Sequence, residues 1–527
     1  MVKFCRQHIE IKEKIRYNMI QWEKLRLIRK VGGKIMSSIE KVSDLLAKKA
    51  ELALGGGKEK QEKQKQGGSM TARERIDALL DDGSFVELGA FVTARNEDTA
   101  ADGVVTGYGT IDSRLVYVYS QDITVLSGAM GEMYAQKVCK VIDMASKMGA
   151  PIIGMLDSNG VRLSEGALAQ SAMGKILNAV SSVSGVVPNI SIVFGNCAGG
   201  SAIAAAMSDF VIMNEKNGKM FVNGIDVIEA TEGKIPAVDA KGSVNESGNA
   251  HFLGADDASC INLAKILLSY LPSNNLSDSF EYETSDELNR PCEILDNIDA
   301  IEDMRVVIAE IADDKAYFEV QADYAKEASV GFIRINGSTV GAVATNGEDL
   351  TGRAVQKMAR FVRLCDCFNI PVLTVTDVEG FKVSASEENW GLVRKCAELA
   401  YTFSEATVAK VNLIAKKAYG SASVLINSKE AGADVVLAYP SAQMAPLAPG
   451  AGATMLYGDK FKEGMSREEL EIEYKENEAS IYNAAKKGCI DDVIVPSETR
   501  ARVAAAFEML KSKRASAPQR KHDNMPL

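Results

Sequence analysis

Histidine is scarce in this chain, which has 527 residues and three histidines, at positions 8, 251 and 522. A metal site built from several histidines, or a mechanism that needs more than one acid–base histidine, therefore has little material. The nine cysteines include no C-x-x-C pair, so neither a zinc ribbon nor a regular disulfide framework is indicated. This cysteine usage is typical of the reducing cytoplasm, and we predict a cytoplasmic protein without a metal.

Positive charge and long apolar runs are lacking as well. The 60 Lys and Arg stand against 71 Asp and Glu, a formal net charge of −11, so nucleic acid is not an expected partner. The strongest apolar run, residues 190–207, is interrupted by Asn196 and three glycines and does not predict a membrane span. A hydrophobic content of 46% over this length is ample for two or more domains with buried cores.

The first 35 residues differ from the rest because they carry ten Lys and Arg against three Glu. Charges interrupt every apolar stretch there, so no signal peptide is predicted. Two interpretations stay open: a native basic helix, or a non-native extension preceding a biological start at Met36.

Three features follow before the compact part of the chain. Apolar positions from Ser37 to Ala53 recur at helical spacing, and the glycines 55–57 end that helix. Residues 58–66 form a solvated charge run. The sequence Thr71-Ala72-Arg73-Glu74 is a capping box that opens a short helix.

Beyond this point, short apolar strands alternate with helical stretches, which predicts an α/β fold. The order repeats along the chain. A strand between Pro151 and Asp157 corresponds to one between Pro371 and Asp377, at an offset of 220 residues. The next strand of each half ends in a glycine turn, at Gly199-Gly200 and at Gly420-Ser421, at an offset of 221 residues. The repetition predicts an internal duplication with two similar domains, joined by the polar segment 271–291.

Each of these two glycine junctions places the end of a strand before the start of a helix. The first N–H groups of a helix lack partners and carry partial positive charge, and glycine lets a ligand oxygen approach the backbone closely. Such a turn can act as an oxyanion hole for the enolate of a thioester, worth about 3–4 kcal/mol per donor. The alternative is that the glycines only allow a helix to pack closely on a strand.

Two reactive side chains lie in or near this pattern without a clear chemical role. His251 is more typical of a hydrogen-bonded structural residue than of a catalytic one. Cys197 precedes the first glycines, but no second histidine is placed to pair with it, so small buried packing is favoured over a thiol nucleophile.

Several segments together form a pattern far more specific than a lone glycine turn. They are Thr71 to Arg75, Asp102 to Gly107, Leu115 to Asp122, Cys197 to Gly200, Phe361 to Arg363, Asn369 to Pro371, Glu405 to Val408 and Arg520 to Leu527. With them, the chain from about residue 37 onward resembles the carboxyltransferase subunits of biotin-dependent acyl-CoA carboxylases and decarboxylases, such as propionyl-CoA carboxylase beta and methylmalonyl-CoA decarboxylase alpha.

The resemblance implies two duplicated crotonase-like domains, residues 36–290 for acyl-CoA and 291–527 for biotin. It implies that the protein moves a carboxyl group between biotin and a short-chain acyl-CoA, through an enolate held in an oxyanion hole. The substrate pair would be propionyl/methylmalonyl-CoA or acetyl/malonyl-CoA. The biotin would arrive on a separate carrier protein, and a biotin carboxylase or a membrane decarboxylase subunit would complete the system, so no ATP site is expected on this chain. Subunits of the family form a hexamer, a dimer of trimers.

The resemblance also assigns site residues. The N–H groups of Gly199 and Gly200 would hold the thioester oxygen, and those of Ser421 and Ala422 the ureido oxygen of biotin. The implied substrate-binding positions are Ser158, Asn159, Gly160, Cys197, Ala198, Gly420 and Val424.

Several positions depart from the usual residues of the resembling family, and the segment around Asn346 to Arg353 is shortened. Asn159 stands where D-S-G-G-A-R has its first glycine, and Glu379 where D-V-P-G-F has proline. Ser421 replaces the second glycine of Y-G-G-A-Y, and Val424 stands where typical propionyl-CoA enzymes have aspartate. Two alternatives therefore stay open beside a carboxylase subunit: the alpha subunit of a sodium-pump decarboxylase, and a non-catalytic structural partner of a true carboxyltransferase.

Overall fold

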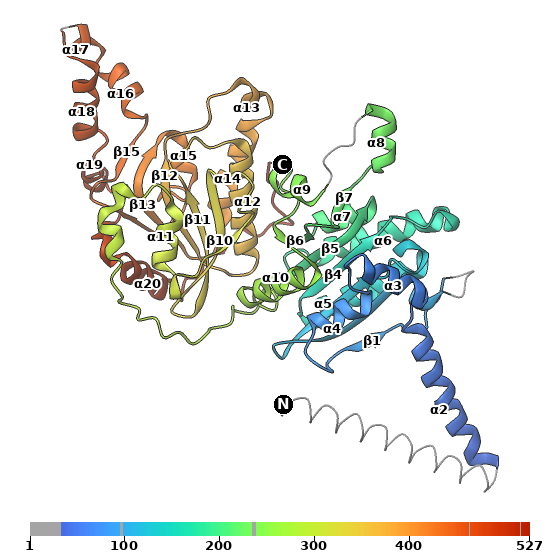
Figure 1. Ribbon diagram of the computed structural model, residues 1–527. Coiled ribbons are helices and arrows are strands. Elements are labelled where there is room, and N and C mark those ends of the chain that lie inside the picture. The colour runs from blue at the N-terminus through green and yellow to red at the C-terminus, as the bar shows by residue number, and fades with distance from the viewer. Residues whose placement is uncertain (1–32, 95–98, 234–238, 463, 517, 527) are drawn as a thin grey trace.

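The computed structural model describes residues 33–94, 99–233, 239–462, 464–516 and 518–526. Two α/β halves lie side by side, the first blue to green and the second yellow-green to red (Figure 1). The predicted basic extension falls mostly on residues 1–32, outside the described residues. Within the described ranges, no helix is both long enough and apolar enough to cross a bilayer.

The first half is built on a mixed sheet in the order β1-β2-β3-β4-β5-β6-β8, with β7 beside β5. Strands β1 to β3 pair antiparallel, and the pairs from β3 onward are parallel. The strands are β1 (Val86–Leu88), β2 (Val104–Ile111), β3 (Arg114–Gln121), β4 (Ile152–Ser158), β5 (Asn189–Ala198), β6 (Phe210–Asn214), β7 (Lys219–Phe221) and β8 (Phe252–Gly254). Every residue of β4 is buried, as expected for a parallel strand covered on both faces.

Besides three short 3-10 segments, nine α-helices accompany this sheet or precede it in the described part of the chain. These are α2 (Gly33–Leu52), α3 (Lys58–Gln66), α4 (Ala72–Leu79), α5 (Glu132–Met148), α6 (Ala167–Val183), α7 (Gly200–Ala206), α8 (Ile225–Glu232), α9 (Ala240–Asn245) and α10 (Asp257–Tyr270). The predicted capping box of α4 is confirmed, because the Thr71 hydroxyl accepts from the Glu74 N–H and the Glu74 carboxylate accepts from the Thr71 N–H. The predicted charge run 58–66 is a helix, α3, with no buried residue.

The second half repeats the plan, with the order β16-β14-β13-β12-β11-β10-β9 and β15 beside β13. Its strands are β9 (Phe318–Val320), β10 (Ala328–Ile335), β11 (Ser338–Thr345), β12 (Val372–Val378), β13 (Lys410–Tyr419), β14 (Val435–Ala438), β15 (Gln443–Ala445) and β16 (Asp492–Val493). Its α-helices are α11 (Met304–Ile311), α12 (Gly352–Cys367), α13 (Ala385–Asn389), α14 (Leu392–Glu405), α15 (Gly420–Leu425), α16 (Pro449–Leu456), α17 (Gly458–Lys462), α18 (Arg467–Asn477), α19 (Ile481–Lys486) and α20 (Thr499–Leu510).

The predicted duplication extends to buried polar contacts. The ammonium of Lys137, on α5, donates to the carbonyl of Ala101 at 2.7 Å and to that of Val104. The ammonium of Lys357, on α12 and 220 positions later, donates to the carbonyls of Gln321 and Ala328 at 2.9 and 2.8 Å. Burial lowers the pKa of both lysines to about 8. Each half therefore uses one lysine to tie a helix to the irregular segment that leads into its sheet.

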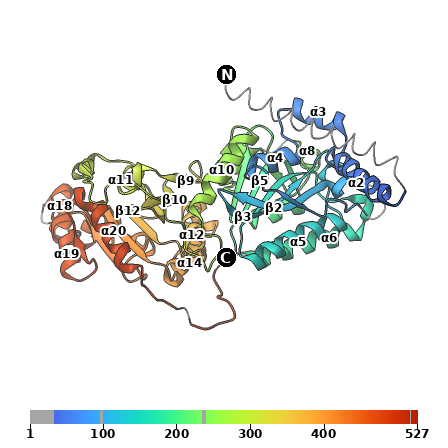
Figure 2. The same ribbon diagram turned by 90° about the horizontal axis from the view of Figure 1, so that it is seen from below.

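A continuous apolar core joins the two halves. One cluster of buried side chains includes residues of both sheets and of α10 and α12. The ring centroids of Phe210 and Phe332 lie 6.1 Å apart, and those of Tyr270 and Phe318 lie 5.5 Å apart in a stacked pair. The segment 271–291 has no helix or strand and runs from α10 to the second half (Figure 1). The two halves also lie side by side when seen from below (Figure 2).

Candidate active site: two glycine junctions

The first junction is the turn from β5 into α7. Gly199 has φ 57° and ψ −120°, a backbone conformation that favours glycine, and it lets the strand end and the helix begin within one residue. The first bond of the helix runs from the Ile203 N–H to the Gly199 carbonyl at 3.2 Å. The N–H of Gly200, at the first helical position, therefore has no partner within the helix.

The N–H of Gly199 is engaged elsewhere. It donates to the carbonyl of Phe221, the last residue of β7, at 2.9 Å. The family resemblance assigns both glycine N–H groups to a thioester oxygen. In this structure the backbone uses the Gly199 donor, because β7 pairs with the end of β5. Of this pair, the Gly199 N–H is thus the one engaged by β7.

Two methionines lie over this junction. A Cβ atom added to Gly200 would lie 2.3 Å from the Met173 sulfur and 3.5 Å from the Met130 Cε. The Ser201 hydroxyl contacts the Met130 sulfur at 3.7 Å. The first junction is thus lined by flexible thioethers, and neither methionine was found from the sequence because Met173, on α6, looks like any half-buried helix residue.

The loop after β4 lies beside the end of β5, and it brings the predicted residues 158–160 to the first junction. The Ser158 hydroxyl accepts from the Gly160 N–H at 3.1 Å, and the Asn159 N–H donates to the Ser127 carbonyl at 3.2 Å. Ser158 is also the β4 residue that pairs with Cys197 across the sheet. These positions are therefore held together by backbone pairing and a local side-chain turn.

The second junction is the turn from β13 into α15. Gly420 has φ 65°, and the Ser423 hydroxyl donates to the Gly420 carbonyl at 2.9 Å. The N–H groups of Ser421 and Ala422 follow as the next donors of the helix start.

The second junction opens on a cavity of about 720 Å³. Gly420, Ser421, Ser423 and Val424 form one wall of it, and the other lining residues come from β15, α16, α18, α19 and the loops beside them. The side chains lining the opposite wall are mainly apolar and include Met444, Pro446, Leu447, Met455 and Leu456. The cavity has the size and character of a small-molecule site.

Ionisable groups near the first junction are held in fixed states. Burial raises the pKa of the Cys197 thiol, so Cys197 stays protonated and packs as a small apolar residue, as predicted. The guanidinium of Arg75 is fully buried between Asp157 and Asp257, at 3.2 and 3.1 Å, and lies 4.3 Å from the centre of the Phe194 ring. This Arg75 triad ties α4 to the end of β4 and to the start of α10.

His251 has the structural role that the sequence favours. Its Nδ1 accepts a hydrogen bond from the Val211 N–H at 3.0 Å, which requires a neutral ring. Burial lowers the pKa of His251 to about 3, so the ring stays neutral at physiological pH. Among the described residues, no group of three or more His, Cys, Asp or Glu is arranged to hold a metal ion.

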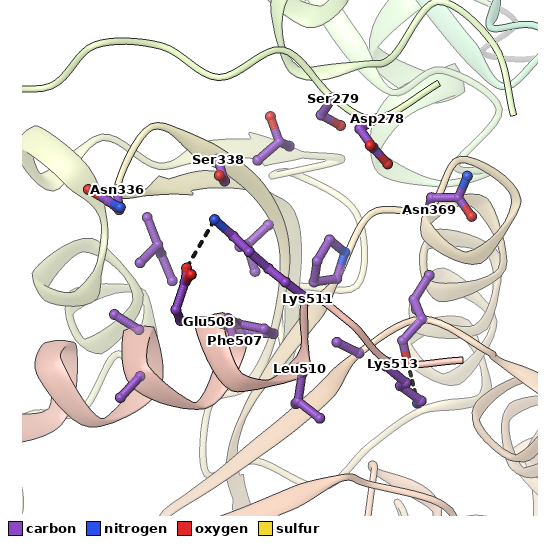
Figure 3. A pocket seen from close by; sticks show the side chains of 18 of the residues that line it. Asp278, Ser279, Asn336, Ser338, Asn369, Phe507, Glu508, Leu510, Lys511 and Lys513 are labelled. Atoms are coloured by element: carbon purple, nitrogen blue, oxygen red, sulfur yellow. Dashed lines mark hydrogen bonds and ion pairs between the residues drawn. The ribbon is translucent and has the colours of Figure 1, made fainter. Parts of the chain in front are cut away.

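A wide groove of about 920 Å³ lies away from both junctions, between the connecting segment and α20. Lys511 pairs with Glu508 at 3.0 Å in it (Figure 3). Lys513, which also lines the groove, pairs with Asp434 at 2.8 Å. These cations are compensated within the chain, and the groove contains none of the predicted site residues.

Known proteins share this arrangement. The carboxyl transferase domain family matches residues 63–525. The chain is 42% identical over 513 residues to methylmalonyl-CoA decarboxylase subunit alpha of Propionigenium modestum, which covers 93% of this chain and 99% of that protein. It is 40% identical over 529 residues to the propionyl-CoA carboxylase beta chain of Saccharopolyspora erythraea, covering 94% and 97%.

Among solved structures, the chain is similar to transcarboxylase 12S, described as a hexamer assembly with methylmalonyl-coenzyme A and methylmalonic acid bound. The TM-score is 0.89 at 38% identity, with 92% of this chain and 98% of that one covered. The likeness, with the two repeated sheets, confirms the predicted α/β fold of two duplicated crotonase-like domains.

Proposed function

We propose that this chain, which belongs to the carboxyl transferase domain family, moves a carboxyl group between carrier-borne biotin and a short-chain acyl-CoA. The observation that carries the proposal is the repetition of one backbone device, a strand ending in a glycine turn with free helix donors, once in each half. Two ligands that exchange a group each need such a donor set. We assign residues 36–290 to acyl-CoA and residues 291–527 to biotin.

In the first half, the N–H of Gly200 would donate to the thioester oxygen. Negative charge develops on that oxygen when the α-carbon loses a proton or a carboxylate, and a fixed backbone donor stabilises the enolate without reorganisation. Ser158, Asn159, Gly160, Cys197 and Ala198 shape the approach to this donor. No side-chain base of this half is required by the proposal.

In the second half, the residues fit biotin. The N–H groups of Ser421 and Ala422 would hold the ureido oxygen, and the apolar walls of the 720 Å³ cavity suit the rest of the bicyclic ring. When bound, biotin would supply the nitrogen that carries or accepts the carboxyl group. Gly420 and Val424 complete the lining, and Val424 is half-exposed at the mouth of the cavity.

Exposed apolar side chains beside both junctions support assembly into a homo-oligomer. Leu163 follows the loop at the first junction and is 86% exposed, and Val383, 220 positions later, is 97% exposed. Helix α8, which projects from the first half (Figure 1), has no buried residue. Met455 on α16 is 78% exposed. Covering such surfaces is favourable at about 25 cal/mol per Å², and a dimer of trimers would bring the halves of different subunits together.

The other components are a biotin carrier protein and either a biotin carboxylase or a membrane decarboxylase subunit. The Propionigenium relative is named as a decarboxylase subunit and the Saccharopolyspora relative as a carboxylase chain, at nearly equal identity, so both directions stay candidates. A cytoplasmic location, with contact to a membrane through a pump subunit in the decarboxylase case, remains a prediction.

The test is transcarboxylation by the purified chain. Free biotin is mixed with malonyl-CoA or methylmalonyl-CoA, and decarboxylated acyl-CoA is followed by mass spectrometry. We expect turnover that depends on biotin. No turnover under conditions where a related active enzyme succeeds would favour the non-catalytic partner.

Two variants of Ser421 provide a matched pair. Ser421→Gly keeps the N–H donor and should change the rate only modestly, whereas Ser421→Pro removes that donor at a helix start, where proline is tolerated, and should lower the rate about 100-fold. A large gain in Ser421→Gly would indicate a chain blocked at the biotin junction.

A further inference from the structure

The duplication places two side-chain contacts at equivalent positions of the two halves, and neither contact has a role in the proposed function. Asn159 is the residue after β4 and Glu379 the residue after β12, and both occupy turns where the resembling family has glycine or proline. Asn196 lies three residues before Gly199, and Lys417 three residues before Gly420. The four residues therefore form two equivalent cross-strand pairs, one at the rim of each junction.

Both pairs are in contact, but their chemistry differs. In the first half, the Asn196 amide donates to the Asn159 amide oxygen at 2.8 Å, a neutral pair. In the second half, the Lys417 ammonium donates to the Glu379 carboxylate at 2.5 Å, an ion pair whose side chains are 31% and 49% exposed.

The backbone fixes the ion pair next to the second junction. Val378 and Ala418 are partners across β12 and β13, and the Lys417 N–H donates to the Asp377 carboxylate at 3.2 Å. Burial, and after it the charge of Glu379, raises the pKa of the Tyr419 phenol, and Tyr419 directly precedes Gly420. The charge of Glu379 therefore acts on the side chain of the residue that leads into the second junction.

A carboxylate at this place is unfavourable for an oxyanion hole. Charge that develops on a ligand oxygen facing the Ser421 and Ala422 N–H groups would be repelled by an uncompensated Glu379, because unit charges still interact strongly over several ångströms near a protein surface. The neutral Asn159–Asn196 pair imposes no such penalty on the first junction.

We propose that Lys417 is a positioning residue of the second junction, which neutralises Glu379 so that the backbone donors can stabilise negative charge on the bound ligand. This proposal rests on the proposed function, because that function places biotin at this junction. Glu379 and Lys417 then act as one unit, and the loss of the lysine alone is worse than the loss of both charges.

A double-mutant cycle in the transcarboxylation assay tests the unit. We expect Lys417→Met to lower the biotin-dependent kcat about tenfold with an unchanged KM for acyl-CoA, Glu379→Gln to stay within about threefold of the wild type, and the double variant to recover to that level. The matched control is Lys511→Met, which breaks the Lys511–Glu508 ion pair in the same half and should leave the rate unchanged.

The salt dependence of the rate is a second measurement, and it would not change if Lys417 had only a structural role. Added KCl screens the uncompensated Glu379 and should partly restore Lys417→Met, while the double variant should not respond in this way. A double variant as slow as Lys417→Met, or a Lys417→Met enzyme as fast as the wild type, overturns the inference while leaving the proposed function intact. A wild-type chain without biotin-dependent turnover overturns the proposed function, and the inference with it.

Discussion

The end of β5 packs so closely on the buried Arg75 triad that one added methyl group should disrupt it. A Cβ atom at Gly195 would lie 2.2 Å from one carboxylate oxygen of Asp157 and 2.7 Å from its Cγ. Ordinary contacts begin near 3.4 Å, so in Gly195→Ala the carboxylate must move by about 1 Å or more and leave Arg75. Displacing one partner of a buried ion pair costs about 3–5 kcal/mol. Because Asp257 still pairs with Arg75, we expect about 3 kcal/mol.

Urea unfolding followed by circular dichroism measures this cost. With a slope of about 3 kcal/mol per M, the midpoint of Gly195→Ala should fall by about 1 M. The matched control is Gly174→Ala on α6, where no atom lies within 4 Å of the added Cβ and the better helix propensity of alanine should raise stability by up to about 1 kcal/mol. If Gly195→Ala costs the same in an Asp157→Ser background, contact with that carboxylate is not the cause and the reasoning is refuted.

Two further predictions concern the first half. Gly200→Ala should lower the free energy of unfolding by about 1 kcal/mol, because the added methyl group meets the Met173 thioether. In the same urea assay, the double variant with Met173→Ala should lose less stability than the sum of the two single variants, and strictly additive losses would contradict the contact. His251 has its pKa lowered to about 3, below the unfolded value near 6.5, so it contributes stability that is complete above pH 6.5 and is lost as the pH falls toward 3. Between pH 6.5 and 5.5, the free energy of unfolding of His251→Asn should therefore fall by about 1 kcal/mol less than that of the wild type, as measured from urea midpoints. The same pH dependence in both proteins would indicate that His251 does not titrate as the structure requires.

Local patterns were enough to predict the repeated sheets. Strands such as β4 and β12 are short apolar runs between a proline and an aspartate, and this pattern survives in both halves. The capping box at Thr71 and the structural role of His251 follow from equally local chemistry. The α/β fold and its duplication could therefore be predicted without any contact information.

The donors and their surroundings could not be predicted in this way. The bond from the Gly199 N–H to Phe221 exists because β7, a three-residue strand, pairs with the end of β5, and three residues carry too little pattern to reveal a strand. Met173 reaches Gly200 from the neighbouring α6, which only the packing of helix on sheet determines. Tertiary placement decides which backbone groups are left for a ligand.

The duplicated backbone also explains why the two junctions differ in their side chains. A strand–turn–helix unit fixes its N–H donors through backbone conformation alone, as at Gly199 and Gly420, so the same device can serve two ligands. Side chains around it are then free to diverge: thioethers crowd the first junction, while an apolar cavity opens at the second. A carboxylate at position 379 is compatible with a hole for negative charge only if a cation accompanies it. Lys417, on the strand that leads into the donor helix, is placed to supply that cation.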